Sequence, residues 1–222
     1  KHHAGLTAEE CKEPNVNAIN KGFCNLEKHI ENIQKFGIQP VVCINAFPAD
    51  TQEEYDVLIE LCAQKGVKAV VSTAFADGGK GAEKLAQAIV EQVATASANY
   101  QPLYLNTASI ESKIETIATT IYGADEVVYS ALANKQLQSI KELGFEHFSI
   151  CMVKTPASFS DDEKMIGRPT GFTVTVREFE FASGAGFIIP LLGDVMRMPG
   201  LPKLPNATRI DIDDNGVISG LS

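Results

Sequence analysis

The chain has 222 residues, of which 45% are hydrophobic and 21% are charged, and its formal net charge is −9. That length can bury one large core or two small ones, and the composition is ordinary for a soluble globular protein. No apolar run approaches the roughly 18–20 residues that a membrane span requires. A general nucleic-acid surface would need a clustered basic face, and the negative net charge argues against one. We therefore expect no membrane and no nucleic-acid partner.

The sequence contains five cysteines, an odd number without a C-x-x-C pair, so we expect neither a disulfide framework nor a zinc site. Cys43 falls in an apolar strand pattern and Cys62 on a helix face, where a free cysteine behaves as a small hydrophobe. No secretory signal peptide is visible at the start of the sequence. We expect a reduced, cytoplasmic setting.

The first hundred residues alternate predicted helices and strands. Asn25 is predicted to cap a helix that ends at Gly37. The apolar run 40–44 predicts a buried strand, the Thr51-Gln-Glu-Glu54 capping box opens a second helix, and residues 67–71 predict a second strand. Strand, helix and strand in this order predict a βαβ unit with a parallel strand pair.

A glycine-rich turn at residues 77–81 follows the second predicted strand and leads into a helix with Leu85, Ile89 and Val93 on its apolar face. Backbone N–H groups of such a turn could cradle a phosphate. The turn matches neither a P-loop nor G-x-G-x-x-G, however, because it lacks the Gly-Lys-Ser/Thr ending of the first and the spacing of the second. We therefore predict a plain tight turn at a helix entry.

Small, polar residues at 94–99 place a domain boundary near residue 100, which predicts domains 1–99 and 100–222. In the second domain, Ser109 is predicted to cap one helix and Asp125 a longer one that reaches Gly144. Strand-like runs follow at residues 148–153, 171–181 and 186–191, and a hairpin about an Asn-Gly turn at 210–218. The predicted fold class is α/β: two small α/β domains, the first with a parallel βαβ sheet and the second with mixed helices and strands.

Three further patterns have plain structural interpretations. Asp211-x-Asp213-x-Asn215-Gly216 fits the first half of a calcium loop, but the twelfth position is Ser222 where glutamate is needed, so a hairpin is favoured. Asp161 and Asp162 suit the first turn of a helix capped by Ser160. No histidine is paired with a nucleophile at a recognisable spacing, and His29 is predicted to share a polar helix face with Lys28. We predict no catalytic residue in this chain and no metal site.

An aromatic residue follows each strand of the predicted βαβ unit. Phe47 comes just after the first strand and Phe75 just after the second. Ligands of open parallel sheets bind outside the carboxyl ends of the strands. A flat heterocycle held between two rings needs a ring-to-ring span of about 7 Å, and loops on neighbouring strands about 4.8 Å apart could supply it. The alternative is that both rings fold back into the core.

Several segments together resemble formate–tetrahydrofolate ligase, also called formyltetrahydrofolate synthetase. The resemblance is collinear over essentially the whole chain and rests on multi-residue matches such as Val41-Val-Cys-Ile-Asn-Ala-Phe-Pro-Ala-Asp-Thr51 and Met198-Pro-Gly-Leu-Pro-Lys203. The other matching stretches are residues 22–32, 121–125, 151–155, 159–162, 167–169, 176–178, 184–187 and 210–211.

That family joins formate to tetrahydrofolate with ATP, through formyl phosphate, to give 10-formyltetrahydrofolate. The resemblance implies that Phe47 and Phe75 hold the pterin between them, although tryptophan is usual at the second position. A phenylalanine still stacks there, with less contact area and without an N–H donor. The resemblance also suggests Arg197 and Lys203 as cations that face a nucleotide or another anion.

The resemblance further implies a C-terminal fragment. The family's P-loop and most of its site for ATP and magnesium belong to a large N-terminal domain that this sequence lacks, so we predict no ligase activity for the chain alone. The expected partners are small-molecule substrates, the missing N-terminal domain and, at full length, further copies in a homo-oligomer. The alternative function is a non-catalytic, stand-alone α/β module that binds a ligand or another protein.

Overall fold

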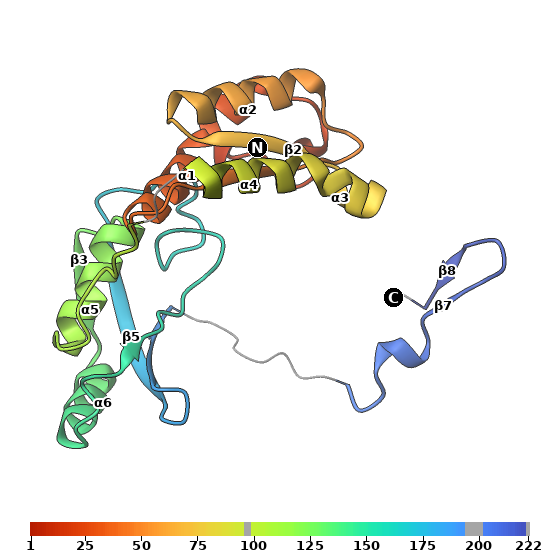
Figure 1. Cartoon of the computed structure of the whole chain (residues 1–222). Coiled ribbons are helices and arrows are strands. Elements are labelled where there is room, and N and C mark those ends of the chain that lie inside the picture. The colour runs from red at the N-terminus through yellow and green to blue at the C-terminus, as the bar shows by residue number, and fades with distance from the viewer. Residues whose placement is uncertain (96–98, 194–201, 221–222) are drawn as a thin grey trace.

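The structure is a computed structural model that describes residues 1–95, 99–193 and 202–220. The described residues form two separate hydrophobic cores, one contributed by residues before position 100 and the other by residues after it. Figure 1 shows the corresponding arrangement, with α1 to α4 gathered at one end and α5, α6 and the long strand β5 at the other. The chain is α/β as predicted, while the exact domain boundary near residue 100 stays a prediction.

The first core is built on a parallel strand pair. Strand β1 (Val41–Asn45) runs parallel to β2 (Lys68–Ser72), with Val41 opposite Lys68 and Asn45 opposite Ser72. The predicted βαβ unit is therefore confirmed. Helix α2 (Gln52–Gln64) connects the strands and begins at the predicted capping box, in which both reciprocal hydrogen bonds between Thr51 and Glu54 are made. In Figure 1, β2 runs between α2 and α4, and it contacts both helices.

Helix α1 (Val16–Gln34) begins ten residues earlier than predicted. Its cap is Asn15, whose side chain accepts a hydrogen bond from the backbone N–H of Ala18. The predicted cap Asn25 lies inside the helix, where its side-chain amide donates to the carbonyl oxygen of Gly167 at 2.9 Å. The prediction was wrong because an asparagine can also serve a distant loop, a use that is invisible in the local sequence.

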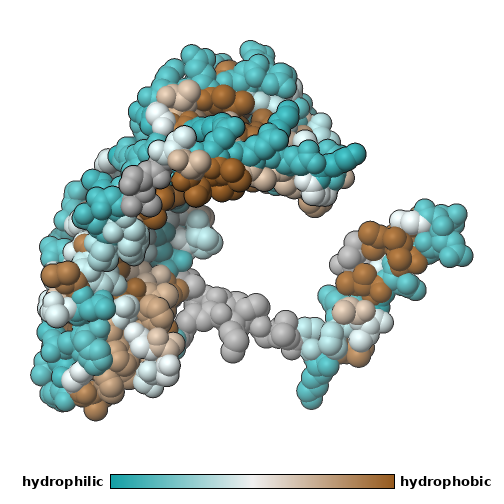
Figure 2. Space-filling model, in the orientation of Figure 1, coloured by the Kyte–Doolittle hydropathy of each residue, from teal (hydrophilic) through white to brown (hydrophobic). Residues whose placement is uncertain are grey.

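The glycine-rich turn is more helical than expected. Helix α3 (Ala74–Asp77) is followed by a 3₁₀ turn, η3 (Gly78–Ala82), and then by α4 (Glu83–Thr95). Much of the apolar face predicted for α4 is exposed. Ile89 and Val93 face outward, and the buried residue of this helix is Ala88. Figure 2 shows this apolar band along α4.

The second core packs helices on a mixed sheet. Helix α5 (Ile110–Ile117) starts at the predicted cap Ser109 and continues into a π-helical turn, η4 (Ala118–Tyr122). The sheet has the strand order β3-β5-β6-β4. Strands β5 and β6 correspond to the strand-like runs predicted at 171–181 and 186–191, and they pair antiparallel. Strands β3 and β4 run parallel to their neighbours β5 and β6. Their bounds are Glu126–Tyr129 for β3, Ser149–Ile150 for β4, Thr173–Ala182 for β5 and Phe187–Leu192 for β6.

Two predictions in this part were wrong. The helix predicted from Asp125 is a strand followed by the shorter helix α6 (Ala131–Glu142), whose cap is Ser130. The backbone N–H of Asp125 instead donates to Phe172 at 2.8 Å, which starts the pairing of β3 with β5. The helix predicted at Ser160 is a loop, in which the Asp161 carboxylate accepts a hydrogen bond from the N–H of Thr175 on β5. Both segments are decided by a distant strand.

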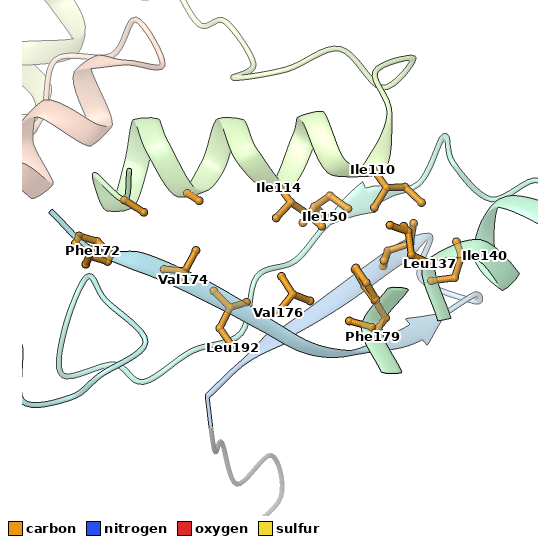
Figure 3. Packing of buried hydrophobic residues seen from close by; sticks show 14 residues of the cluster. Ile110, Ile114, Leu137, Ile140, Ile150, Phe172, Val174, Val176, Phe179 and Leu192 are labelled. Carbon is orange, nitrogen blue, oxygen red and sulfur yellow. The ribbon is translucent and has the colours of Figure 1, made fainter. Parts of the chain in front are cut away.

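Strand β5 contributes a row of buried side chains to the second core. Val174 and Val176 point to the same buried face, and a bulge after Val176 shifts the alternation so that Phe179 is the next buried residue. Figure 3 shows these side chains meeting Ile110 and Ile114 of α5. Ile110 and Ile114 are completely buried in this cluster, and Ile117 packs against it partly buried, so this side of α5 faces the core.

The described C-terminal residues form the predicted hairpin, with β7 (Asp211–Ile212) antiparallel to β8 (Ile218–Ser219). An oxygen of Asp213 accepts hydrogen bonds from the N–H groups of Asn215 and Val217, so the residues of the calcium-like pattern serve the turn itself. The other short helical turns are η1 (His2–Ala4), η2 (Glu10–Lys12) and η5 (Asn206–Thr208). None of the described helices combines the length and apolarity of a membrane span.

Candidate functional site

Phe47 lies on a short loop that hydrogen bonds hold in place. The loop follows β1, and the N–H of Phe47 donates to the carboxylate of Asp50, while the N–H of Asp50 donates back to the carbonyl oxygen of Phe47. The hydroxyl of Tyr55, in the first turns of α2, donates to the same carboxylate at 3.2 Å. Burial and then the charge of Asp50 raise the pKa of Tyr55, which keeps it protonated and a donor. The Phe47 ring therefore lies on a loop whose conformation is fixed by hydrogen bonds.

Phe75 lies on α3, at the carboxyl end of the neighbouring strand β2. Thr73 accepts two backbone hydrogen bonds from Ala76 and Asp77, and its hydroxyl donates to the Asp77 carboxylate at 2.7 Å. The N–H of Thr73 also donates to the carbonyl oxygen of Gly81. The backbones of Gly81 and Thr73 are so close that a Cβ on Gly81 would lie 2.4 Å from the Thr73 carbonyl carbon, so only glycine fits at this position.

Phe47 and Phe75 line one cavity of about 780 Å³ at the carboxyl ends of β1 and β2. The rings are 59% and 88% exposed, so the alternative in which both fold back into the core is wrong. Among the ring contacts of the described residues, none joins Phe47 to Phe75, so the two rings do not stack on each other. The volume lies in the range of small-molecule and cofactor pockets.

The same cavity has a cationic side. Lys80 in η3 and Lys84 in the first turn of α4 both line it. Neither ammonium group has a hydrogen-bond or ion-pair partner among the described residues. Of the described lining residues, the only carboxylate is Asp77, which is engaged by the Thr73 hydroxyl. The cavity therefore combines two exposed rings with two unpaired positive charges.

The other two predicted site residues are Lys203 and Arg197. Lys203 is exposed in the segment before η5 and is not among the residues that line the cavity at Phe47 and Phe75. Arg197 lies outside the described residues. The assignment of either cation to a nucleotide stays a prediction.

The prediction that His29 and Lys28 share a polar helix face was wrong for Lys28. The Lys28 side chain is buried, and its ammonium donates to the carbonyl oxygen of Thr120 at 2.8 Å. His29 as a residue is exposed, but its ring contacts the Phe159 ring, and the loss of solvent around the ring lowers the pKa of His29.

A second cavity, of about 610 Å³, lies between α1, residues 100–106 and α5. Its walls are mainly apolar and aromatic, with Phe36, Tyr100 and Tyr104 among them. Neither predicted ring lines it, and its described lining includes no lysine or arginine. For a ligand that is both planar and anionic, the cavity at Phe47 and Phe75 is therefore the better match.

Three residues of that cavity were missed from the sequence. The sequence pattern places Tyr55 on the apolar face of the second predicted helix and Lys80 within the glycine-rich turn, and it does not single out Lys84. The sequence did contain a signal for Tyr55. It lies one turn after Thr51, the cap of α2, and therefore near the same edge of the sheet as Phe47. The convergence of the two lysines on the rings depends on the folding of η3 against β2, and no periodicity reveals it.

Comparison with known proteins gives one clear result. A sequence model of the family described as formate–tetrahydrofolate ligase matches residues 1–222, the whole length of the chain. The match includes both strand ends that carry the exposed rings and confirms the resemblance found in the individual segments. The chain therefore belongs to the formate–tetrahydrofolate ligase family.

Proposed function

We propose that this chain provides the tetrahydrofolate-binding site of an ATP-dependent ligase that converts formate and tetrahydrofolate to 10-formyltetrahydrofolate. Family membership supports a ligase of this kind with these substrates. The observation that carries the finer proposal is the pair of exposed rings, Phe47 and Phe75, on one cavity at the carboxyl ends of two adjacent parallel strands.

In this proposal the flat pterin lies between the two phenyl rings. Offset aromatic stacking adds about 0.5–1.5 kcal/mol per pair beyond the burial of apolar area. The hydrogen bonds around Asp50 and Thr73 hold the two loops before the ligand arrives, so little conformational entropy is lost when it binds. Phenylalanine at position 75 offers a smaller stacking face than tryptophan would, and we expect correspondingly weaker binding.

The described residues do not fit the nucleotide and its magnesium ion. No group of three or more potential ligands among the described histidine, cysteine, aspartate and glutamate side chains could hold a metal ion. The sequence contains no Gly-x-x-x-x-Gly-Lys-Ser/Thr segment to cradle the phosphates. We therefore assign no step of phosphoryl transfer to this chain and expect residues 1–222 alone to make no 10-formyltetrahydrofolate from ATP and formate.

Calorimetric titration of the chain with tetrahydrofolate under reducing conditions tests the pterin site. We expect saturable binding that the double variant Phe47→Ala/Phe75→Ala abolishes, while circular dichroism shows an unchanged fold. Absence of binding at millimolar tetrahydrofolate by a demonstrably folded chain would overturn the site and favour the non-catalytic module. A steady-state assay that detects ATP- and formate-dependent product from the chain alone would overturn the expected inactivity.

A further inference from the structure

Two lysines without partners border the cavity that carries the exposed rings. We infer that Lys80 and Lys84 bind the carboxylates of the glutamyl tail of the folate, so that this site selects pteroylglutamates by their negative charge as well as by their ring. The inference rests on the proposed pterin site. It adds a subsite for the tail and names the residues that form it.

The charge distribution supports this assignment. The chain carries a formal net charge of −9, so an anionic substrate is repelled by the molecule as a whole and needs local cations to bind. Lys80 and Lys84 supply them, because neither ammonium is neutralised by a described carboxylate. The Asp77 carboxylate in the lining accepts a hydrogen bond from Thr73.

Helix stability does not explain Lys84. It lies in the first turn of α4, next to Glu83, where the helix dipole favours acidic residues and disfavours a cation. Its side chain faces the cavity instead of an acidic neighbour on the helix. A charge that costs local stability and has no partner is consistent with a role in ligand binding.

Lys80, Lys84 and Phe75 lie on a continuous segment of the chain whose backbone is held by hydrogen bonds. Lys80 precedes Gly81, whose carbonyl oxygen accepts hydrogen bonds from the N–H of Thr73 and the hydroxyl of Ser72. Lys84 follows one turn later on α4. These bonds fix the base of both lysine side chains relative to α3, which carries Phe75. A ligand stacked on that ring can therefore meet both cations without rearrangement of the backbone.

The chemistry matches folate closely. Tetrahydrofolate joins a planar pterin to an aminobenzoyl group and then to glutamate, so the rings and the negative charge lie at opposite ends of the molecule. A cavity of about 780 Å³ is large enough for a drug-sized ligand, and both lysines are among the residues that line it. Each further γ-linked glutamate adds one carboxylate, which gives the two lysines more negative charge to bind.

Titration of three ligands against matched variants tests the inference. The ligands are a tailless tetrahydropterin, tetrahydrofolate with one glutamate, and the triglutamate form. Exposed ion pairs contribute modestly, so we expect Lys80→Gln and Lys84→Gln each to weaken triglutamate binding by roughly 1.5- to 5-fold. The double reversal Lys80→Glu/Lys84→Glu should weaken it by about tenfold or more and leave the tailless pterin within about twofold. Lys135→Gln, at an exposed site on α6, is the control matched in charge to the two single variants and should change nothing.

The possible outcomes separate this inference from the pterin site itself. Equal affinity of the wild-type chain for tailless and triglutamate ligands would overturn the tail subsite and leave the pterin site standing. Equal loss of both ligands in the lysine variants would also overturn it. Binding of triglutamate that depends on the lysines, without any binding of tailless pterin, would support the tail subsite and overturn the ring site. Inorganic phosphate or ATP that binds through the same lysines more tightly than the triglutamate would assign them to phosphate instead.

Discussion

The Lys28 ammonium donates a hydrogen bond of 2.8 Å to the carbonyl oxygen of Thr120. One helical turn further along α1, the amide of Asn32 donates to the carbonyl oxygen of Ile121 at the same distance. Both carbonyls belong to the π-helical turn after α5, near a helix end where carbonyl groups lose their intrahelical donors. The two residues therefore join the first core to the second through polar groups that each side would otherwise leave unpaired.

Replacement of Lys28 by methionine should destabilise the chain. The change keeps the apolar stem but leaves the Thr120 carbonyl without a donor, a loss that costs about 1–3 kcal/mol for a buried group. Urea denaturation should show that decrease in the free energy of unfolding. Lys35→Met, at an exposed position on the same helix end, is the control and should shift it by less than about 0.5 kcal/mol. A Lys28 variant as stable as this control would contradict the role of the contact.

Glu54 should make stability depend on acidic pH. Burial by itself would raise the pKa of Glu54, but the Lys1 ammonium at 2.7 Å and the N–H groups of Asn15 and Thr51 lower it to about 2. The folded-state pKa lies below the unfolded value of 4.5, so the carboxylate stabilises the fold fully above that pH. Its contribution is lost as the pH falls from about 4.5 toward 2.

The difference in unfolding free energy between the wild type and Glu54→Gln measures this contribution. We expect the difference to be largest near neutral pH and to shrink steadily below about pH 4.5. Glu53→Gln, at the exposed neighbouring position, serves as the control. A Glu54 difference that stayed constant across the acidic range would show that the carboxylate is not linked to folding in this way.

Single substitutions of the two rings should weaken tetrahydrofolate binding by similar amounts. Phe47→Ala and Phe75→Ala each remove one stacking face, worth about 0.5–1.5 kcal/mol beyond lost burial. Phe75→Trp should tighten binding, because indole offers a larger face and an N–H donor. Calorimetry measures all three. Loss of binding in only one alanine variant would argue against a ligand held between two rings.

Gly81 should be required for the geometry of the Phe75 loop. A Cβ at this position would lie 2.4 Å from the Thr73 carbonyl carbon and 2.6 Å from the Ala74 nitrogen, so Gly81→Ala must push α3 away. We expect a loss of about 1–3 kcal/mol in stability and weaker binding of tailless tetrahydropterin. Gly79→Ala is the matched control, since nothing lies within 4 Å of a Cβ there. Equal behaviour of the two variants in thermal melts and titrations would refute the requirement.

The cysteines should differ sharply in reactivity. Cys62 is completely buried, and burial raises its pKa to about 11, whereas Cys43 is exposed on β1. The thiolate is the reactive form, so iodoacetamide at about pH 8 should alkylate Cys43 and leave Cys62 unmodified in the native chain. Mass spectrometry of tryptic peptides reports both sites. Modification of Cys62 before urea is added would contradict its burial.

The confirmed predictions depend on residues that are close together in the sequence. The Thr51–Glu54 capping box, the cap at Ser109 and the parallel pair around α2 all follow from signals a few residues long, and the structure has each of them. The exposed rings could be located because strand ends in a βαβ unit meet at one sheet edge. What the local pattern could not decide was whether the rings pointed inward or outward.

The predictions that were wrong concern segments whose partners lie far away in the chain. Residues 126–129 form a strand because β5 supplies backbone hydrogen-bond partners for them, so the helix begins only at Ala131. Lys28 is buried because the π-helical turn presents a carbonyl oxygen to it. Short-range periodicity and motif matches are enough to predict the class of fold, the family and the edge of the sheet at which the rings lie. Which polar groups are paired, and which lysines line the cavity with the rings, depends on chain segments that are brought together only by tertiary packing.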